Sequence, residues 1–385
     1  MSCDLDHVID RLCTESAKWH AYPQDVLPLW VADMDFACPE PVIQALHERV
    51  SHGIFGYPAE PPDLRAVVVD WIWRSYNWRV QPEALVFLPG IVVGFNLAIR
   101  AVARPGDGIL AQTPVYFPIL WAPANSGCHL DTMELTHLPD GSYGVDMDAF
   151  VAAITPGTRV FVLCNPHNPV GRVFRRDELE AMALACRRHD LVICSDEIHC
   201  DLVYGGHRHL PVASLDPDIG QHTITLMAPS KTFNIAGLHS SFAVVENAEL
   251  RDAFVKARAG LVSGISVLGY VAMLAAYRDG RPWLDALLRY LQSSRDSLAE
   301  SVTAHLPGIA MCKPEGTFLA WLDCRASRLP KNPKRFFLEK ARLALNGGAS
   351  FGPGGDGFVR LNFGCPRATL AEALDRMAKA MESLD

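Results

Sequence analysis

Between residues 83 and 245, short apolar runs alternate with stretches of helical periodicity, and this alternation limits the possible folds. The apolar runs are continuous, which is typical of strands buried on both faces of a parallel sheet. Helical stretches between such strands indicate crossover connections that place helices on both faces of the sheet. The expected strands are 106–112, 159–166, 191–197, 223–230 and 241–245, and the expected helices are 94–103, 148–154 and 177–190.

The pattern after residue 280 is different and indicates a second, smaller α+β domain. Thr369 with Glu372 three residues later resembles a capping box that would start the last helix. We predict an α/β fold in which residues 46–280 form the large domain, with a mostly parallel sheet flanked by helices. The irregular N-terminal arm, residues 1–45, is expected to pack with residues 281–385. The expected helices of that region are 282–306 and 369–384, and the expected strands are 317–324 and 357–363.

Composition excludes several classes of protein. The 385 residues carry a formal net charge of -8 without basic blocks, which argues against a nucleic-acid-binding face. The first residues lack the pattern of a secretory signal, and no run of eighteen apolar residues could span a membrane. The 11 cysteines include no Cys-x-x-Cys pair, so neither a structural zinc site nor a disulfide framework is expected. We therefore expect a cytoplasmic protein with reduced, mostly buried cysteines and no metal.

Polar residues follow several of the expected strands at the point where each strand ends. In parallel sheets, ligands bind beyond the carboxyl ends of the strands, so these residues are candidates for one shared site. They supply amide, carboxylate, hydroxyl and amine groups. The candidates are Asn165, Asn168, Asp196, Ser230 and Lys231.

The lysine of this set suggests a chemistry. An ammonium group between apolar walls has a lowered pKa, and such lysines form Schiff bases with carbonyl compounds. A carboxylate at a neighbouring strand end, Asp196, could pair with a cationic ring nitrogen. This combination is what pyridoxal 5'-phosphate requires, and the turn and helix start in residues 88–96, with Ser230, could bind its phosphate.

Each candidate also has a purely structural interpretation. Lys231 could be a solvated lysine, Asp196 a helix N-cap and Asn168 an Asx-turn residue. Tyr57 and Tyr116 could be half-buried packing residues. Arg360 could be an arginine on the surface of a strand.

Several motifs, taken in order, identify a resemblance that covers nearly the whole chain. The sequence resembles the fold-type I pyridoxal-phosphate enzymes, the aspartate aminotransferase superfamily. Within it, the chain is most similar to the cystathionine β-lyase, or cysteine-S-conjugate β-lyase, branch. The motifs are "LPLWVADMDF" (27–36), "GIFGYP" (53–58), "TPVYFPI" (113–119), "NPHNPVG", "SDEIHCDLVY", "APSKTFNIAGL" and "GFVRLNFGCPR" (357–367).

The resemblance implies roles for residues around the cofactor ring. Lys231 binds the cofactor covalently and later acts as the base at the substrate Cα. Asp196 faces the pyridinium nitrogen, Asn168 lies near the ring hydroxyl, and Tyr116 stacks on the ring face. Lys231, Tyr116 and Asp196 are thus the implied catalytic residues.

Further roles concern the phosphate and the substrate. Ser230 and the backbone of Ile91 and Val92 would hold the phosphate. Tyr57 resembles the tyrosine that reaches the phosphate of the neighbouring subunit, which implies a homodimer with shared active sites. Arg360 resembles the arginine that binds the substrate α-carboxylate.

Two positions depart from the pattern of many aminotransferases in this superfamily. His199 stands where they carry tyrosine, and His239 stands where they carry an arginine against the phosphate. His199 could contact the ring hydroxyl or be a core histidine, whereas His239 is not expected to be a strong phosphate ligand. Asp33 and Asp35 belong to a strip that lines the substrate entrance in related enzymes, and we assign them no catalytic role. Solvated loop carboxylates are the alternative for both.

The implied activity is α,β-elimination from L-cystathionine or a related L-cysteine S-conjugate, giving a thiol, pyruvate and ammonia. Both departures favour a β-lyase. The alternatives are an aminotransferase acting on aromatic or sulfur amino acids, a C–S lyase of a specialised sulfur pathway, and a regulatory protein-binding role. The leaving thiol depends on loops near Trp30, Phe36, Tyr116 and Trp121.

Overall fold

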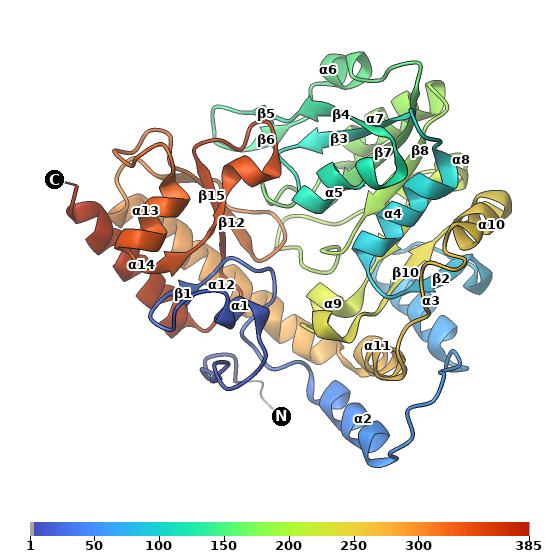
Figure 1. Cartoon of the computed structure of the whole chain (residues 1–385), viewed down its shortest axis with the longest axis horizontal. Coiled ribbons are helices and arrows are strands. Elements are labelled where there is room, and N and C mark those ends of the chain that lie inside the picture. Colours follow the sequence, from blue (N-terminus) through green and yellow to red (C-terminus); the bar gives the residue numbers. More distant parts are fainter. Residues whose placement is uncertain (1–3, 385) are drawn as a thin grey trace.

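Seven strands form the larger sheet of the computed structural model, which describes residues 4–384 (Figure 1). Their order is β2-β10-β9-β8-β7-β3-β4, and β10 runs antiparallel to both of its neighbours, whereas the other pairs are parallel. The sequence prediction of a mostly parallel sheet is confirmed. The strands are β2 (Leu85–Leu88), β3 (Gly108–Thr113), β4 (His129–Glu134), β7 (Thr158–Cys164), β8 (Val192–Asp196), β9 (Thr223–Met227) and β10 (Ser241–Val244).

Helices cover both faces of this sheet, which explains why the sequence of β7 is continuously apolar. Val160 and Val162 pack in one core with α4 (Ile91–Val102) and α10 (Ala248–Ala257). Phe161 and Leu163 point to the opposite face and pack with α6 (Met147–Ala152) and α7 (Arg176–Arg188). The remaining helices that join strands of this sheet are α5 (Phe117–Trp121) and α8 (Pro217–Gln221), and the hairpin β5 (Thr136–His137) and β6 (Tyr143–Gly144) lies at its margin.

A second, four-stranded sheet has the order β11-β12-β15-β14, and all of its pairs are antiparallel. The N-terminal arm joins this part of the molecule through β1 (Leu27–Pro28), which pairs in parallel with β13 (Leu343–Ala344), and Figure 1 shows the arm beside the C-terminal elements. The arm therefore packs as expected, while the domain boundaries near residues 46 and 280 stay a prediction. The other elements are β11 (Ala310–Met311), β12 (Leu319–Asp323), β14 (Asn346–Gly347), β15 (Phe358–Asn362), α12 (Arg281–His305), α13 (Pro333–Lys340) and α14 (Arg367–Glu382).

Further helices complete the fold around the larger sheet and the arm. A core formed by the arm, α12 and the second sheet also includes side chains of α3 and α11, so one apolar cluster joins these parts. Burial of this extent stabilises the arrangement through the hydrophobic effect. These helices are α1 (Ala17–His20), α2 (Glu40–Ser51), α3 (Leu64–Tyr76) and α11 (Val267–Asp279).

The start of the last helix differs from the prediction. α14 begins at Arg367 and its N-cap is Pro366, so Thr369 lies inside the first turn and is 9% exposed. The amide of Leu370 already donates to the carbonyl of Pro366, which leaves no cap position for Thr369. The predicted capping box is therefore wrong, because Pro366 marks the helix start instead.

Two sequence expectations concern what the chain lacks. Within residues 4–384, no helix is both long and apolar enough to cross a membrane. The cysteines that the structure describes are free thiols, and most of them are buried, as expected for core residues.

Candidate active site

A cavity of about 520 Å³ lies at the carboxyl ends of β8 and β9, where the arm and β15 approach the larger sheet. Its wall includes the start of α4 and the loops that follow β3 and β7. The sequence placed the candidate residues at these strand ends, and the structure brings most of them to this one cavity. The lining residues with ionisable, polar or aromatic side chains include Trp30, Tyr116, Asn168, Asp196, Lys231 and Arg360.

Lys231 lies in the short helix α9 (Pro229–Thr232), which follows directly on β9. The pKa of its ammonium group is lowered to about 8, mainly by burial and also by the charge of Arg360, against the opposing effect of Asp33 and Asp196. The amine donates a hydrogen bond to the carbonyl of Ala32 at 2.5 Å. The wall of the cavity therefore holds an amine that is more easily deprotonated than an exposed lysine.

Asp196 is the last residue of β8 and is 3% exposed. Its carboxylate accepts the backbone N–H of Ile198 at 3.1 Å, but it forms no ion pair with any residue between 4 and 384. Burial raises the pKa of Asp196 to about 7. A buried carboxylate without a paired cation is unfavourable, so this group fits a ligand that brings a positive charge into the cavity.

Arg360, on β15, is 2% exposed, which excludes the interpretation as a surface arginine. One terminal nitrogen donates to Oδ1 of Asn168 at 2.9 Å, and the other donates to the carbonyl of Trp30 at 2.8 Å. Its Nε has no hydrogen-bond partner within the described chain. Burial lowers the pKa of Arg360 to about 10, so the group stays cationic and offers donors to a carboxylate.

Tyr116 and Asn168 are joined through their backbones, because the amide of Tyr116 donates to the carbonyl of Asn168 at 3.0 Å. Tyr116 is the N-cap residue of α5, and its ring is half-buried in the cavity wall. Burial raises the pKa of its hydroxyl group. The phenol is therefore neutral, and the ring offers a flat apolar surface.

One end of the cavity is suited to an anion. The first amides of α4, those of Ile91 and Val92, have no intrahelical partner, as at any helix start. Gly90 precedes them, and a Cβ at this position would meet no atom within 4 Å, so the backbone is open to the cavity. Ser230 lines the same end. Ser240, which the sequence reasoning missed, also lines it, and its buried hydroxyl has no partner among the described residues.

Both histidines that depart from the aminotransferase pattern line the cavity. His199 is 1% exposed, its Nδ1 has no partner within residues 4–384, and its ring meets Phe318 edge-on at 5.7 Å. Burial lowers the pKa of His199 well below its usual value, and the positive charges of Lys231 and Arg360 act in the same direction. His199 is therefore neutral. Unlike the buried His199, His239 is exposed.

Two of the sequence candidates for the site, Asn165 and Tyr57, do not line the cavity. Asn165 is buried, and its Oδ1 accepts the amide of Phe174 at 3.1 Å. Tyr57 is the second. It lies in the segment between α2 and α3 and is fully exposed. It does not line the 520 Å³ cavity. An exposed tyrosine agrees with a role in a second copy of the chain, and that role stays a prediction.

Pyridoxal phosphate fits this set of groups. Lys231 offers an amine for the cofactor aldehyde, and the buried, unpaired carboxylate of Asp196 offers a partner for a protonated ring nitrogen. The α4 start and the free hydroxyl of Ser240 offer donors for the phosphate. Tyr116, Asn168 and Ser230 would also hold the cofactor.

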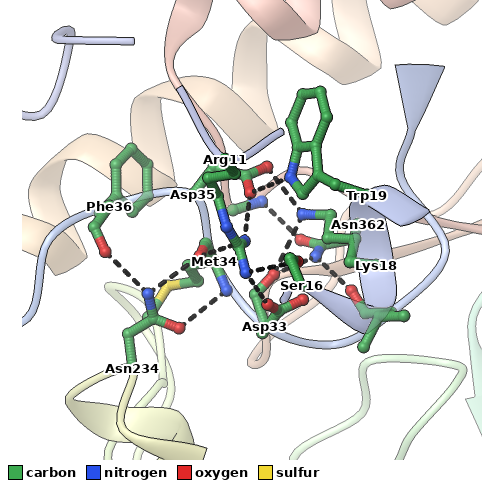
Figure 2. A network of polar contacts seen from close by, with 12 residues as sticks. Arg11, Ser16, Lys18, Trp19, Asp33, Met34, Asp35, Phe36, Asn234 and Asn362 are labelled. Atoms are coloured by element: carbon green, nitrogen blue, oxygen red, sulfur yellow. Dashed lines mark hydrogen bonds and ion pairs between the residues drawn. The ribbon is translucent and has the colours of Figure 1, made fainter. Parts of the chain in front are cut away.

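The arm contributes more to the site than the sequence indicated. Trp30, Val31 and Ala32 line the cavity, whereas Asp33 and Asp35 do not line it and instead accept hydrogen bonds from Arg11, Lys18 and Trp19 (Figure 2). The interpretation of the two aspartates as solvated loop carboxylates is wrong, because Asp35 is 5% exposed and both form ion pairs. Arg11 and Lys18 carried no sequence signal, since nothing local distinguishes them from surface cations.

Comparison with known proteins gives consistent results along the whole chain. Residues 24–377 match the family model of aminotransferase class I and II. The chain is 39% identical to the cystathionine β-lyase PatB of Bacillus subtilis, over 98% of this chain and 100% of that protein. A crystal structure of OvoB has a TM-score of 0.94 at 46% identity, covering 98% of this chain and 99% of the other. Cystalysin from Treponema denticola, whose crystal structure contains pyridoxal 5'-phosphate, has a TM-score of 0.96 at 31% identity and covers both chains completely.

Proposed function

The chain belongs to the aminotransferase class I and II family, and on that premise we propose that it is a pyridoxal-phosphate-dependent C–S β-lyase. The substrate is L-cystathionine or a related L-cysteine S-conjugate, and the products are a thiol, pyruvate and ammonia. The observation that carries this proposal is full-length similarity to a cystathionine β-lyase, combined with a cavity that holds Lys231, Asp196 and Arg360.

Three residues of the cavity have separate roles in the reaction. When bound, pyridoxal phosphate supplies an electron sink that is conjugated with the substrate amine. Arg360 binds the substrate α-carboxylate and so fixes the position of Cα. Lys231, whose pKa is lowered to about 8, accepts the proton from Cα. Asp196 holds a negative charge opposite the ring nitrogen and stabilises the positive charge there.

The bond that breaks is the one between Cβ and sulfur. Once the Cα proton is on Lys231, a double bond forms between Cα and Cβ while the electron pair of the C–S bond leaves with sulfur as a thiolate, which then takes up a proton. The three-carbon remainder leaves as an enamine, and water converts it to pyruvate and ammonia. Apart from water, no second substrate is needed, whereas transamination also consumes a keto acid.

Incubation of the purified holoenzyme with L-cystathionine and no keto acid tests the proposal. Elimination is expected to continue over many turnovers, with pyruvate and free thiol formed in equal amounts. An aminotransferase would instead stop after one half-reaction, because its cofactor would stay in the amine form. Pyruvate can be followed by coupled reduction and thiol by a colorimetric reagent. Less than one equivalent of pyruvate per active site would refute the lyase assignment.

We further propose that the enzyme is a cytoplasmic homodimer in which Tyr57 serves the neighbouring active site. The full exposure of Tyr57 and the exposed apolar residues Ile54 and Phe55 beside it support this arrangement. Such a segment is suited to contact with a second copy. Buried free cysteines support a reducing compartment.

Mixing two impaired variants tests the shared site. Tyr57→Phe is expected to weaken cofactor binding by about tenfold, because one hydrogen bond to an anion is lost. When Tyr57→Phe and Lys231→Ala subunits are unfolded together and refolded, mixed dimers should contain one site with both native residues. Activity at low cofactor concentration should therefore exceed that of either variant alone. No gain on mixing would show that Tyr57 acts within its own subunit or not at all.

A further inference from the structure

Residues 30–36, which we call the strap, form neither a helix nor a strand, and residues 30–32 line the cavity that holds Lys231. A segment of this kind has no ladder of backbone hydrogen bonds to fix the direction of its carbonyl groups. Here side chains supply the donors instead. The strap carbonyls of residues 30–34 and of Phe36 each accept a hydrogen bond from a side chain elsewhere in the protein.

Asparagine side chains provide the neutral contacts of the strap. Asn346 donates to the Trp30 carbonyl, whereas Asn234 and Asn362, each of which follows a site residue closely in sequence, bind later carbonyls. Asn234 lies three residues after Lys231, and Asn362 lies two residues after Arg360. Figure 2 shows them reaching the strap from different elements. The strap therefore joins the chain segment of the lysine to the strand of the arginine.

Asn234 binds one side of the strap. Its Nδ2 donates to the carbonyls of Met34 at 2.9 Å and Phe36 at 2.7 Å, and its Oδ1 accepts the amide of Met34 at 2.9 Å. Its backbone has a φ of 55°, in the left-handed region that asparagine tolerates better than most residues. This backbone conformation and the three hydrogen bonds restrict the position to few residue types.

Asn362 binds the other side. Its Nδ2 donates to the carbonyls of Val31 at 2.6 Å and Asp33 at 2.7 Å, which flank Ala32. Its Oδ1 accepts the amide of Gly364 at 2.8 Å, so its amide group is held in one orientation. The carbonyl that meets Lys231, that of Ala32, thus lies between two carbonyls bound by one side chain.

A cluster of charges, of which Lys18 and Asp35 are buried, also holds the strap. Arg11 pairs with Asp33 at 2.8 Å and with Asp35 at 2.5 Å, and Lys18 pairs with Asp35 at 2.7 Å. The side chain of Lys18 is fully buried, so removing Asp35 would leave its ammonium group as a buried charge without a paired carboxylate. This cluster anchors the strap to the arm (Figure 2).

We propose that Asn234 and Asn362 are positioning residues that hold the strap so that the Ala32 carbonyl orients the amine of Lys231 whenever that amine is not bound to the cofactor. The same strap gives Arg360 an acceptor at the Trp30 carbonyl. Both site residues are therefore set relative to each other through one backbone segment. The inference rests on Lys231 as the cofactor lysine of the proposed function, but it does not depend on which reaction follows.

The test measures the protonation of Lys231 in protein freed of cofactor. The extent to which an amine-reactive acylating reagent modifies Lys231 is measured at a series of pH values by peptide mass spectrometry. Asn234→Gly removes the side chain, keeps the left-handed backbone accessible and leaves the charges of Asp33, Asp196 and Arg360 unchanged. The half-reaction pH of Lys231 should fall by at least about half a unit, because its ammonium form loses a fixed acceptor.

The control and a second variant make the result decisive. Asn77 is also an asparagine in the left-handed region, with a φ of 56°, and it caps α3 away from the strap. Asn77→Gly should therefore leave the Lys231 half-reaction pH unchanged. Asn362→Ala disturbs the strap from the other side and should shift it in the same direction as Asn234→Gly, so either variant can decide if the other does not fold. An unchanged half-reaction pH in a folded strap variant, even one with a lower melting temperature, would overturn the proposal.

Discussion

Lys231→Ala is expected to abolish the visible absorbance band of the bound cofactor and to lower the turnover of an L-cysteine thioether by about 10³-fold or more. Two functions are lost together, because Lys231 is both the amine that binds the cofactor aldehyde and the base at Cα. Its short helix follows β9 directly, and burial lowers its pKa to about 8. Absorbance spectra of the purified protein and pyruvate release from L-cystathionine measure the two effects separately.

A second lysine substitution serves as the control. Lys256 lies on the exposed side of α10, and Lys256→Ala should retain both the absorbance band and normal turnover. Lys231→Ala also removes a charge that burial disfavours. The melting temperature of this variant should therefore fall by no more than the loss of one hydrogen bond, that to the Ala32 carbonyl, explains. Full turnover by Lys231→Ala would be incompatible with the proposed function.

Asp196→Asn is expected to reduce kcat/KM by about 10³-fold while the visible absorbance band persists. Asparagine has nearly the same shape, so the cavity is preserved, and Lys231 can still bind the cofactor. What is lost is the negative charge that keeps the ring nitrogen protonated. Measurement of steady-state kinetics with the spectrum of the same sample separates this effect from loss of cofactor. Wild-type kcat/KM in a cofactor-saturated Asp196→Asn sample would contradict the assigned role.

The same substitution should stabilise the protein when the cofactor is absent. Burial raises the pKa of Asp196 from its ordinary value of 3.8 to about 7 in the folded protein. The folded state therefore binds this proton more tightly than the unfolded state does. The stabilisation that the bound proton provides is lost as pH rises from about 4 through 7. Cofactor-free Asp196→Asn lacks this loss, so at pH 8 it should melt a few degrees higher than the wild type, and the difference should vanish at low pH.

Asp201 provides a matched comparison on the same segment. It is also a buried carboxylate, but it accepts hydrogen bonds from the side chains of Trp71, Tyr76 and Thr232. Asp201→Asn replaces one acceptor oxygen by a donor and should lower the melting temperature instead. Opposite signs for the two substitutions would show that Asp196 is an unpaired charge kept for function and Asp201 a structural anchor. A lower melting temperature for cofactor-free Asp196→Asn would count against that view.

Much of the site could be predicted because it depends on where strands end. Asp196 and Lys231 follow continuous apolar runs, and parallel strands deliver such residues to one edge of the sheet. The periodicity of β7 and β8 likewise specified buried strands with helices on both faces. These features are local, so the sequence alone contains them.

Other residues of the site could not be found this way. Ser240 follows a glycine turn and has no distinguishing neighbours, and its role emerges only from a buried hydroxyl without a partner in the described chain. Arg11 and Lys18 look like surface cations until the arm folds back and buries Lys18 against Asp35. Asp33 and Asp35 were misjudged for the same reason. Their environment is created by segments distant in sequence.

The sequence by itself determined the parallel sheet, the order of its strands along the chain and the lysine and carboxylate at adjacent strand ends, because periodicity and strand termini are local properties. Only the tertiary structure decided that an irregular arm segment would line the cavity, with Asn234 and Asn362 holding its carbonyls. The physical reason is that a segment without its own backbone ladder takes its conformation from side chains up to 331 residues away.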